Sequence, residues 1–231
     1  MKIENPEKQL ILGIDDAGRG PVIGPMALAG CLVNNEIEKE FKELGVKDSK
    51  LLLPKKRELL AEKIKQKSLS YFVVLTYPYE IDSKIKSGIN LNRVEAEKAS
   101  EIINNIAEKY PDEKIRVVID CPSPNKESWR KVVIRKICRQ ENIFVACEHK
   151  ADRDYVAVSA ASILAKSRRE EEIEKLKQKI GMDFGSGYPH DPKTIEFLKN
   201  YSREYEKDGI FRETWQTWEN NKAEKEQKKL F

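Results

Sequence analysis

Aspartate residues mark the positions where this chain could do chemistry. Asp15 and Asp16 end one short apolar run, Asp120 ends another, and Asp152 precedes an alanine-rich stretch. Buried neighbouring carboxylates repel one another and are tolerated mainly where a cation neutralises them. Oxygen ligands in a chain with only two histidines favour Mg²⁺ or Mn²⁺ over zinc. Two such ions about 4 Å apart would bind the attacking and leaving oxygens of a phosphodiester.

A simpler reading of each aspartate stands beside this one. A single aspartate after a strand is more often a turn residue or a helix cap. Periodicity alone does not show that the aspartates meet in space. Asp154 is read as a charge that favours the N-terminus of a helix.

The loop from Asp16 to Pro21 is the most distinctive local feature. Gly18 and Gly20 flank Arg19, so backbone amides can approach a ligand closely beside a cation. No Gly-Lys-Ser/Thr follows, which excludes a Walker A loop, and the spacing does not match the dinucleotide pattern G-x-G-x-x-G.

The elements that must hold these residues alternate between strand and helix patterns. This order predicts an α/β sheet with helices packed on its faces. Strands are expected at 10–14, 26–33, 70–77, 115–119 and 143–147, and helices at 54–67, 95–110, 127–141 and 155–178, with further helices after Pro192 and near the C-terminus. From Asn220 to Lys229 the chain is nearly all polar and is expected to fray or extend into solvent.

Composition limits the class of protein. The 231 residues fit one large domain, or one domain with a small helical appendage. A net charge of +4 is too mild to identify a nucleic-acid binder by itself. No apolar run is long enough for a membrane span, and the four cysteines form no C-x-x-C pair. We therefore expect a cytoplasmic protein.

Several ordered motifs resemble the ribonuclease HII family, in particular its archaeal branch. The run Asp15–Pro21 is similar to the family's Asp-Glu-Ala-Gly-Arg-Gly motif. Further similar segments are Asp48-Ser49-Lys50, Lys150-Ala151-Asp152, the block 158–166 (VSAASILAK), the turn 185–189 (GSGYP) and the stretch 212–217 (RETWQT). The resemblance covers residues from about 9 to 220.

The resemblance implies a ribonuclease H-like mixed sheet flanked by helices, with a helical C-terminal region. It places a catalytic domain over residues 1–195 and the C-terminal region over 196–231, whose tail we expect to be mobile. The implied reaction is cleavage of the RNA strand of RNA–DNA hybrids, and cleavage 5′ to ribonucleotides embedded in duplex DNA. The ends would be a 3′-hydroxyl and a 5′-phosphate. The implied roles are ribonucleotide removal and RNA primer removal, by a monomer.

Site residues carry over position by position from the family motifs. The resemblance makes Asp15, Asp16, Asp120 and Asp152 the catalytic ligands of two metal ions, Mg²⁺ or Mn²⁺. The backbone of Gly18, Arg19 and Gly20 would read the 2′-hydroxyl, the group that distinguishes RNA from DNA. Tyr188 would pack against the sugar of the next deoxynucleotide, and the remaining implied substrate contacts are Lys50, Asn92, Lys150 and Lys166.

One residue departs from the family pattern. The second acid of the family is glutamate, and here it is Asp16, whose side chain is shorter by one methylene. The charge is kept but the reach is reduced by about 1.5 Å. We expect an active enzyme with an altered metal preference that favours Mn²⁺, while weakened catalysis is the alternative.

Two other functions share part of this pattern. A structure-selective or resolvase-like nuclease would use the carboxylates without the Gly-Arg-Gly loop or Tyr188. A nucleic-acid-binding protein whose catalysis Asp16 has damaged would bind without cutting.

Two interpretations remain open for a basic segment and for the C-terminal segment. Lys55, Lys56 and Arg57 could contact a phosphate backbone or form a solvated helix face. The segment 227–231 (QKKLF) resembles the start of a sliding-clamp docking motif but lacks its aromatic pair, and an apolar frayed terminus is the alternative.

Overall fold

The computed structural model describes residues 9–46 and 52–227. These residues form two compact units, each assembled from several segments of the chain. The first unit contains the described residues within 9–17, 27–74 and 92–168, and the second contains 18–26, 75–91 and the residues from 169 onward. The domain division predicted at residue 195 stays a prediction.

A five-stranded mixed sheet forms the centre of the first unit, which confirms the predicted fold class. Its strands lie in the order β3-β2-β1-β4-β5, with β1 antiparallel to β2 and parallel to β4, and β4 parallel to β5. All residues of β2, and all of β1 except Asp16, are buried, which agrees with the apolar composition of β2 and of the first five residues of β1. The strands are β1 Leu10–Ala17, β2 Met26–Val33, β3 Ser70–Thr76, β4 Ile115–Asp120 and β5 Ile143–Glu148.

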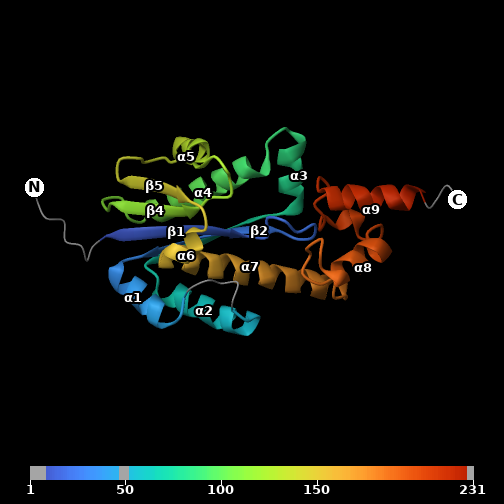
Figure 1. Ribbon diagram of the computed structural model, residues 1–231, viewed down its shortest axis with the longest axis horizontal. Helices are drawn as coiled ribbons and strands as arrows, with labels where there is room; N and C mark the ends of the chain where they lie inside the picture. The colour runs from blue at the N-terminus through green and yellow to red at the C-terminus, as the bar shows by residue number, and fades with distance from the viewer. Residues whose placement is uncertain (1–8, 47–51, 228–231) are drawn as a thin grey trace, which may run out of the picture. The chain divides into compact units, whose positions relative to one another are not determined.

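Helices cover both faces of this sheet (Figure 1). One face carries α4 Leu91–Ala107 and α5 Lys126–Arg135. The opposite side carries α1 Asn35–Glu43, α2 Pro54–Lys67 and the first part of α7 Val156–Ile180, which the short helix α6 Ala151–Asp154 precedes.

Two glycines allow helices to approach the sheet closely. A Cβ added at Gly13 of β1 would lie 2.1 Å from the carbonyl carbon of Ala157 in α7. A Cβ added at Gly30 of β2 would lie 2.3 Å from Cγ2 of Ile102 in α4. A side chain at Gly13 would meet the backbone of α7, and one at Gly30 would displace the side chain of Ile102, so both glycines allow close packing of helix on sheet.

The second unit is mainly helical and has an aromatic core. Phe211 and Trp218 stack with their ring centroids 4.4 Å apart, and Phe184 and Phe197 are packed in the same cluster. The helices are α3 Pro78–Lys86, the part of α7 from Arg169, α8 Pro192–Tyr201, a 3₁₀ turn Glu206–Asp208 and α9 Gln216–Gln227. The predicted helical C-terminal region is therefore confirmed. None of the described helices is long and apolar enough to cross a membrane.

Some element boundaries differ from the prediction. α5 ends at Arg135 instead of Glu141, because the Asn104 side chain bonds the backbone where α5 ends, at Lys136 O (2.9 Å) and Cys138 N (2.9 Å). α1 and α3 were not predicted.

The residues from Asn220 to Gln227 are helical, where a frayed or extended segment was predicted. Lys225 explains the difference: its Nζ donates to the carbonyl oxygen of Leu198 (2.9 Å) and to Oγ of Ser202 (2.6 Å). These bonds tie α9 to the end of α8.

Candidate metal centre

Three aspartates meet at one end of the sheet in the first unit. Asp15 follows Ile14 on β1, Asp120 follows Ile119 on β4, and Ile14 pairs with Ile119 across these parallel strands. Asp152 is supplied by α6. One carboxylate oxygen from each aspartate lies within 4.8 Å of those of the other two. The two strand-end residues are therefore neighbours because of strand pairing, and α6 adds the third.

The short helix α6 is fixed by backbone conformation and hydrogen bonds. Lys150 precedes it in a left-handed conformation, with φ of 59°, and the extended backbone of Tyr155 separates it from α7. The amide of Ala151 donates to Oδ1 of Asp120 over 3.1 Å. The hydroxyl of Ser159 in α7 donates to the carbonyl oxygen of Asp152 over 2.5 Å. Asp152 is thus held from both sides.

The electrostatics of this carboxylate group call for a cation. Asp15 is 7 % exposed and Asp152 is 2 % exposed. Burial raises the pKa of Asp15 well above its ordinary value, and the negative charges of Asp16 and Asp120 raise it further, against a hydrogen bond with Ser162 that lowers it. A divalent cation would offset both the burial of the Asp15 charge and its repulsion by neighbouring carboxylates. Three carboxylates suit an ion that prefers oxygen ligands. The residues present therefore fit a divalent metal.

Asp16 lies outside this group of three. Successive side chains on a strand point to opposite faces, so Asp15 and Asp16 of β1 diverge. Asp16 is half-buried, and its amide donates to Oδ1 of Asp15 over 2.7 Å. Its role as a fourth ligand stays a prediction.

A second group of predicted residues lies in the second unit, around the glycine loop. Gly18 has a φ of +85°, a conformation that favours glycine. The fully buried Arg212 donates to the carbonyl oxygens of Gly18 (2.7 Å), Arg19 (2.9 Å) and Gly24 (3.0 Å). One arginine thus fixes the backbone of the whole loop.

Tyr188 belongs to this second group. A Cβ added at Gly20 would lie 3.8 Å from Cε1 of Tyr188, which places the ring beside the loop. The guanidinium of Arg169 lies over the ring, 5.0 Å from its centroid, and the ring of His190 lies 5.5 Å away. The loop and the turn that carries Tyr188 are therefore brought together, although 168 positions separate Gly20 from Tyr188 in the sequence.

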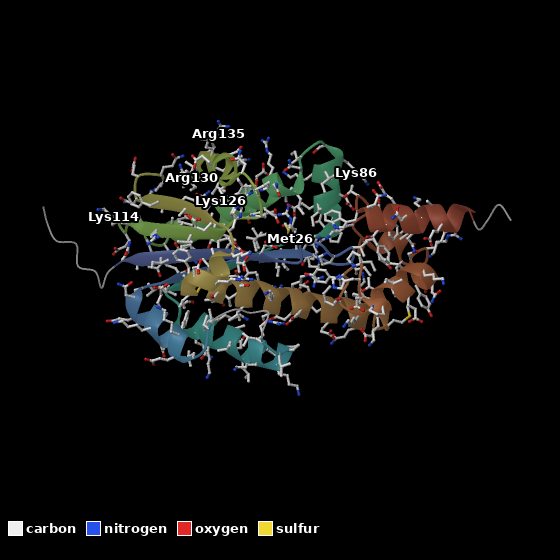
Figure 2. All side chains as sticks on the ribbon, viewed as in Figure 1. Met26, Lys86, Lys114, Lys126, Arg130 and Arg135 are labelled. Atoms are coloured by element: carbon white, nitrogen blue, oxygen red, sulfur yellow. The ribbon has the colours of Figure 1, made fainter. Side chains whose placement is uncertain are left out.

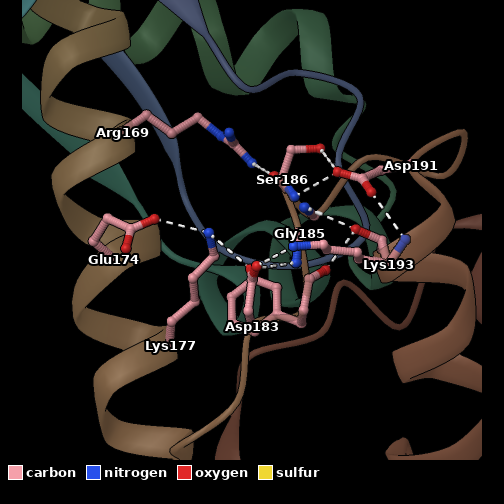
Figure 3. Close-up of polar contacts among 11 residues, drawn as sticks. Arg169, Glu174, Lys177, Asp183, Gly185, Ser186, Asp191 and Lys193 are labelled. Carbon is pink, nitrogen blue, oxygen red and sulfur yellow. Dashed lines mark hydrogen bonds and ion pairs between the residues drawn. The ribbon is translucent and has the colours of Figure 1, made fainter. Parts of the chain in front are cut away.

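Carboxylates shape the turn that precedes Tyr188 (Figure 3). Asp191 accepts hydrogen bonds from the amide (2.7 Å) and the hydroxyl (2.6 Å) of Ser186. Asp183 accepts from the amide of Gly185 (3.0 Å), and its bond with Lys193 is the main cause that lowers its pKa. These acids are structural, although by type they could have been taken for catalytic residues.

The remaining predicted contacts are scattered over the first unit. Lys150 is exposed, Lys166 is half-buried on α7, and Asn92 is half-buried on α4, where its carbonyl oxygen accepts from Nε1 of Trp129 over 2.8 Å. Lys50 lies outside the described residues.

Arg57 is not available for a phosphate. It is 8 % exposed, and its Nη2 donates to the carbonyl oxygen of Leu52 over 2.8 Å. Lys55 and Lys56 are exposed. The possibility of a phosphate contact at Arg57 is therefore corrected, because the guanidinium stabilises the start of α2.

Sequence reasoning missed the residues that hold the glycine loop and Tyr188 in place. Arg169 and Arg212 were not singled out, because an isolated arginine is expected at the surface. The only signal was the position of Arg212 at the head of the stretch 212–217. Ser162, which lies in the block 158–166, was given no role of its own, and it hydrogen-bonds Asp15.

Comparison with known proteins decides the family. The sequence profile of the ribonuclease HII family matches residues 12–218. The chain belongs to the ribonuclease HII family. It is therefore a nuclease that acts on RNA–DNA hybrids, and its buried carboxylates form a candidate site for a divalent metal.

Relatives match over nearly their whole length. The ribonuclease HII of Methanosarcina barkeri is 40 % identical over 222 residues, which are 93 % of this chain and 96 % of the relative. That of Pyrococcus horikoshii is 42 % identical over 208 residues, 90 % of each chain.

Two solved structures are similar as well. The crystal structure of ribonuclease H2 from Pyrococcus horikoshii superposes with a TM-score of 0.81 at 37 % identity, covering 94 % of this chain and 98 % of that one. Ribonuclease HII from Archaeoglobus fulgidus, solved in a complex with PCNA, superposes with a TM-score of 0.77 at 37 % identity, covering 90 % and 95 %. The predicted ribonuclease H-like fold is confirmed.

Proposed function

We propose that Asp15, Asp120 and Asp152 bind divalent metal ions, Mg²⁺ or Mn²⁺, with two ions in the active complex. The reaction is hydrolysis on the 5′ side of a ribonucleotide in a duplex, which leaves a 3′-hydroxyl and a 5′-phosphate. The buried group of three carboxylates supports this proposal. When bound, such ions activate the attacking water and stabilise the charge on the leaving oxygen.

Neighbouring groups of the chain orient these ligands. The Ala151 amide holds Oδ1 of Asp120, and the hydroxyl of Ser159 holds the backbone of Asp152. Ligands fixed in this way need little rearrangement when a cation binds, which favours affinity. We propose Asp16 as the fourth acid, in the place of the family's glutamate.

Substrate recognition is assigned to the second unit and to basic residues of the first. The backbone of Gly18, Arg19 and Gly20 reads the 2′-hydroxyl, and the fixed carbonyl oxygens of Gly18 and Arg19 support this because the loop is rigid before substrate binds. The Tyr188 ring packs against the sugar of the next deoxynucleotide. Phosphate contacts come from Lys50, Asn92, Lys150 and Lys166.

A duplex with one embedded ribonucleotide tests the proposal. The wild-type chain should cut 5′ to the ribonucleotide with Mg²⁺ or Mn²⁺ and leave an unmodified DNA duplex intact. Asp120→Asn should abolish cutting with unchanged folding, while Asp112→Asn, at an exposed position, should cut normally. Cutting of branched DNA instead would support a structure-selective nuclease, and binding without cutting would support a protein with damaged catalysis.

We also propose docking of a sliding clamp through the segment 227–231, of which residues 228–231 lie outside the described residues. The support is the motif-like sequence QKKLF and the relative from Archaeoglobus fulgidus solved with PCNA. Deleting the last five residues should abolish binding to a clamp. Absence of binding by the intact chain would dismiss the proposal.

We propose that the protein works in the cytoplasm. All four cysteines are free, and three of them are buried, as a reducing cytoplasm allows. There the enzyme would act as a monomer in ribonucleotide removal and RNA primer removal.

A further inference from the structure

The positive charge of the chain is concentrated around α5. Residues 126–139 contain six basic side chains and one acidic side chain, a net charge of +5, whereas the whole chain carries +4. The rest of the chain is therefore close to neutral. The basic residues of this segment are Lys126, Arg130, Lys131, Arg135, Lys136 and Arg139.

The inner face of α5 is fixed, which determines the side that faces solvent. Trp129 and Val133 are buried, at 5 % and 0 % exposure. Nε1 of Trp129 donates to the carbonyl oxygen of Asn92 (2.8 Å), and the Ser100 hydroxyl donates to that of Val133 (3.1 Å). Both partners lie on α4, so α5 cannot rotate without breaking buried hydrogen bonds.

Three cations around α5 are exposed and make no salt bridge within the described part of the chain. They are Lys131, Arg135 and Arg139. Lys126 and Arg130, by contrast, are paired with acids. Figure 2 shows Lys126, Arg130 and Arg135 along α5 on the side of the sheet away from α1 and α2. We call Lys131 and Arg135 of α5, together with Arg139 beyond its end, the α5 ridge.

α5 starts at the same end of the sheet as the carboxylates. Nζ of Lys126, its first residue, lies 2.7 Å from Oε2 of Glu148, and Glu148 pairs with Asp120 across β4 and β5. From there α5 returns toward the opposite end, where β5 begins. Ten helical residues span about 15 Å, roughly the rise of four base pairs.

We propose that the α5 ridge binds the phosphates of the duplex arm that extends past the cleaved bond. Lys131 and Arg135 are four positions apart, so both side chains project from one face of the helix. Long, exposed basic side chains that form no salt bridge exchange counterions for phosphates at little desolvation cost. The ligand is the nucleic-acid duplex that is the substrate of this family, so this proposal rests on the proposed function. The ridge would add affinity without sequence preference.

A salt titration of binding tests the ridge. The probe is a DNA duplex of about three helical turns with one central ribonucleotide, held in chelator so that it is not cut. The test variant is Lys131→Gln/Arg135→Gln. The matched control is Lys39→Gln/Lys42→Gln, which removes two exposed lysines from α1, a helix that also carries four glutamates.

The two outcomes differ in the salt dependence. Between about 50 and 200 mM salt, the slope of log K against log salt concentration should become shallower by about 1.8 for the ridge variant, from about 0.9 per lost contact. The control should keep the wild-type slope. An unchanged slope for the ridge variant would overturn the proposal, and so would equal losses for variant and control, because a general charge effect would then explain both.

Asymmetric duplexes locate the contact. Trimming the arm on one side of the ribonucleotide to about four base pairs should make the ridge variant and the wild type bind with equal affinity. Trimming the other arm should leave the wild type with the higher affinity. Persistence of the difference with both trimmed duplexes would contradict an arm contact. Cleavage of the untrimmed duplex by the wild type, once metal is added, tests the proposed function separately. If cleavage occurs and the salt slopes of wild type and ridge variant do not differ, only the ridge proposal is wrong.

Discussion

Nη2 of Arg212 donates a hydrogen bond of 2.7 Å to the carbonyl oxygen of Gly18, 194 positions earlier in the chain. The same guanidinium binds the carbonyl oxygens of Arg19 and Gly24. A fully buried charge with this many acceptors shapes the loop instead of contacting solvent. The position of the Gly-Arg-Gly backbone therefore depends on a residue near the C-terminal end of the chain.

Arg212→Gln should destabilise the protein and impair cleavage together. Glutamine cannot serve three carbonyl oxygens, and the unsatisfied acceptors should lower the free energy of unfolding by about 3 kcal/mol. Chemical denaturation measures this change, and cleavage of a single-ribonucleotide duplex measures the loss of rate. Arg203→Gln is the control, since Arg203 is exposed and binds one carbonyl oxygen; its effect should stay within about 0.5 kcal/mol. Equal effects of the two substitutions would contradict the role of Arg212.

Gly20→Ala should separate folding from recognition. A Cβ at Gly20 would meet Tyr188 at 3.8 Å, an ordinary contact, so the fold should tolerate it. The added methyl would nonetheless stand where the proposed 2′-hydroxyl contact needs close backbone approach, so cleavage should fall by at least about tenfold, or 1.4 kcal/mol. Gly18→Ala is the comparison. Its Cβ would lie 2.3 Å from Arg169 and its φ is +85°, so this substitution should reduce stability as well as cleavage. Full activity of Gly20→Ala would dismiss the loop as the reader of the 2′-hydroxyl.

The raised pKa of Asp15 predicts how stability depends on pH. Between its ordinary pKa of 3.8 and the raised value, the folded metal-free chain holds a proton that the unfolded chain has lost. The free energy of unfolding therefore falls as the pH rises through this window. In chelator at neutral pH, Asp15→Asn should melt at a higher temperature than the wild type, by about 2–4 °C for each kcal/mol gained, and should not cut.

Metal and a matched variant complete that experiment. Added Mn²⁺ should raise the melting temperature of the wild type and leave Asp15→Asn unchanged, since the cation replaces the proton. Asp112→Asn, at an exposed position, should melt as the wild type does. A lower melting temperature for Asp15→Asn than for the wild type in chelator would show that charge repulsion does not govern this site.

The short side chain of Asp16 should alter metal preference. Its half-buried carboxylate lies outside the group formed by Asp15, Asp120 and Asp152, and it reaches less far than the glutamate of the family. We expect the ratio of the cleavage rate in Mn²⁺ to that in Mg²⁺ to be higher for the wild type than for Asp16→Glu, by about tenfold if one ligand contact is involved. Equal ratios for the two proteins would contradict this explanation.

Part of the candidate site follows from the sequence on physical grounds. Asp15 and Asp120 each end an apolar strand, and parallel pairing of buried strands brings their ends together. The family resemblance added Asp152, but not the separate helix α6 that carries it. That helix depends on the left-handed backbone of Lys150, and a lysine gives no sign of such a conformation in the sequence.

The supporting residues could not be predicted in the same way. Arg169 and Arg212 are buried against carbonyl oxygens that are distant in the sequence, and only the folded chain shows those partners. α1 is different, since the local signal was present. Asn34 caps it by accepting from the amide of Ile37 over 2.9 Å.

Anomalous diffraction at the manganese absorption edge, from crystals grown with Mn²⁺, tests the metal centre most directly. We predict a peak within about 2.5 Å of carboxylate oxygens of Asp15, Asp120 and Asp152, the range of ionic oxygen ligands. The peak should be lost in Asp120→Asn crystals. A manganese peak at other residues in an active enzyme, with none among these three aspartates, would contradict the account.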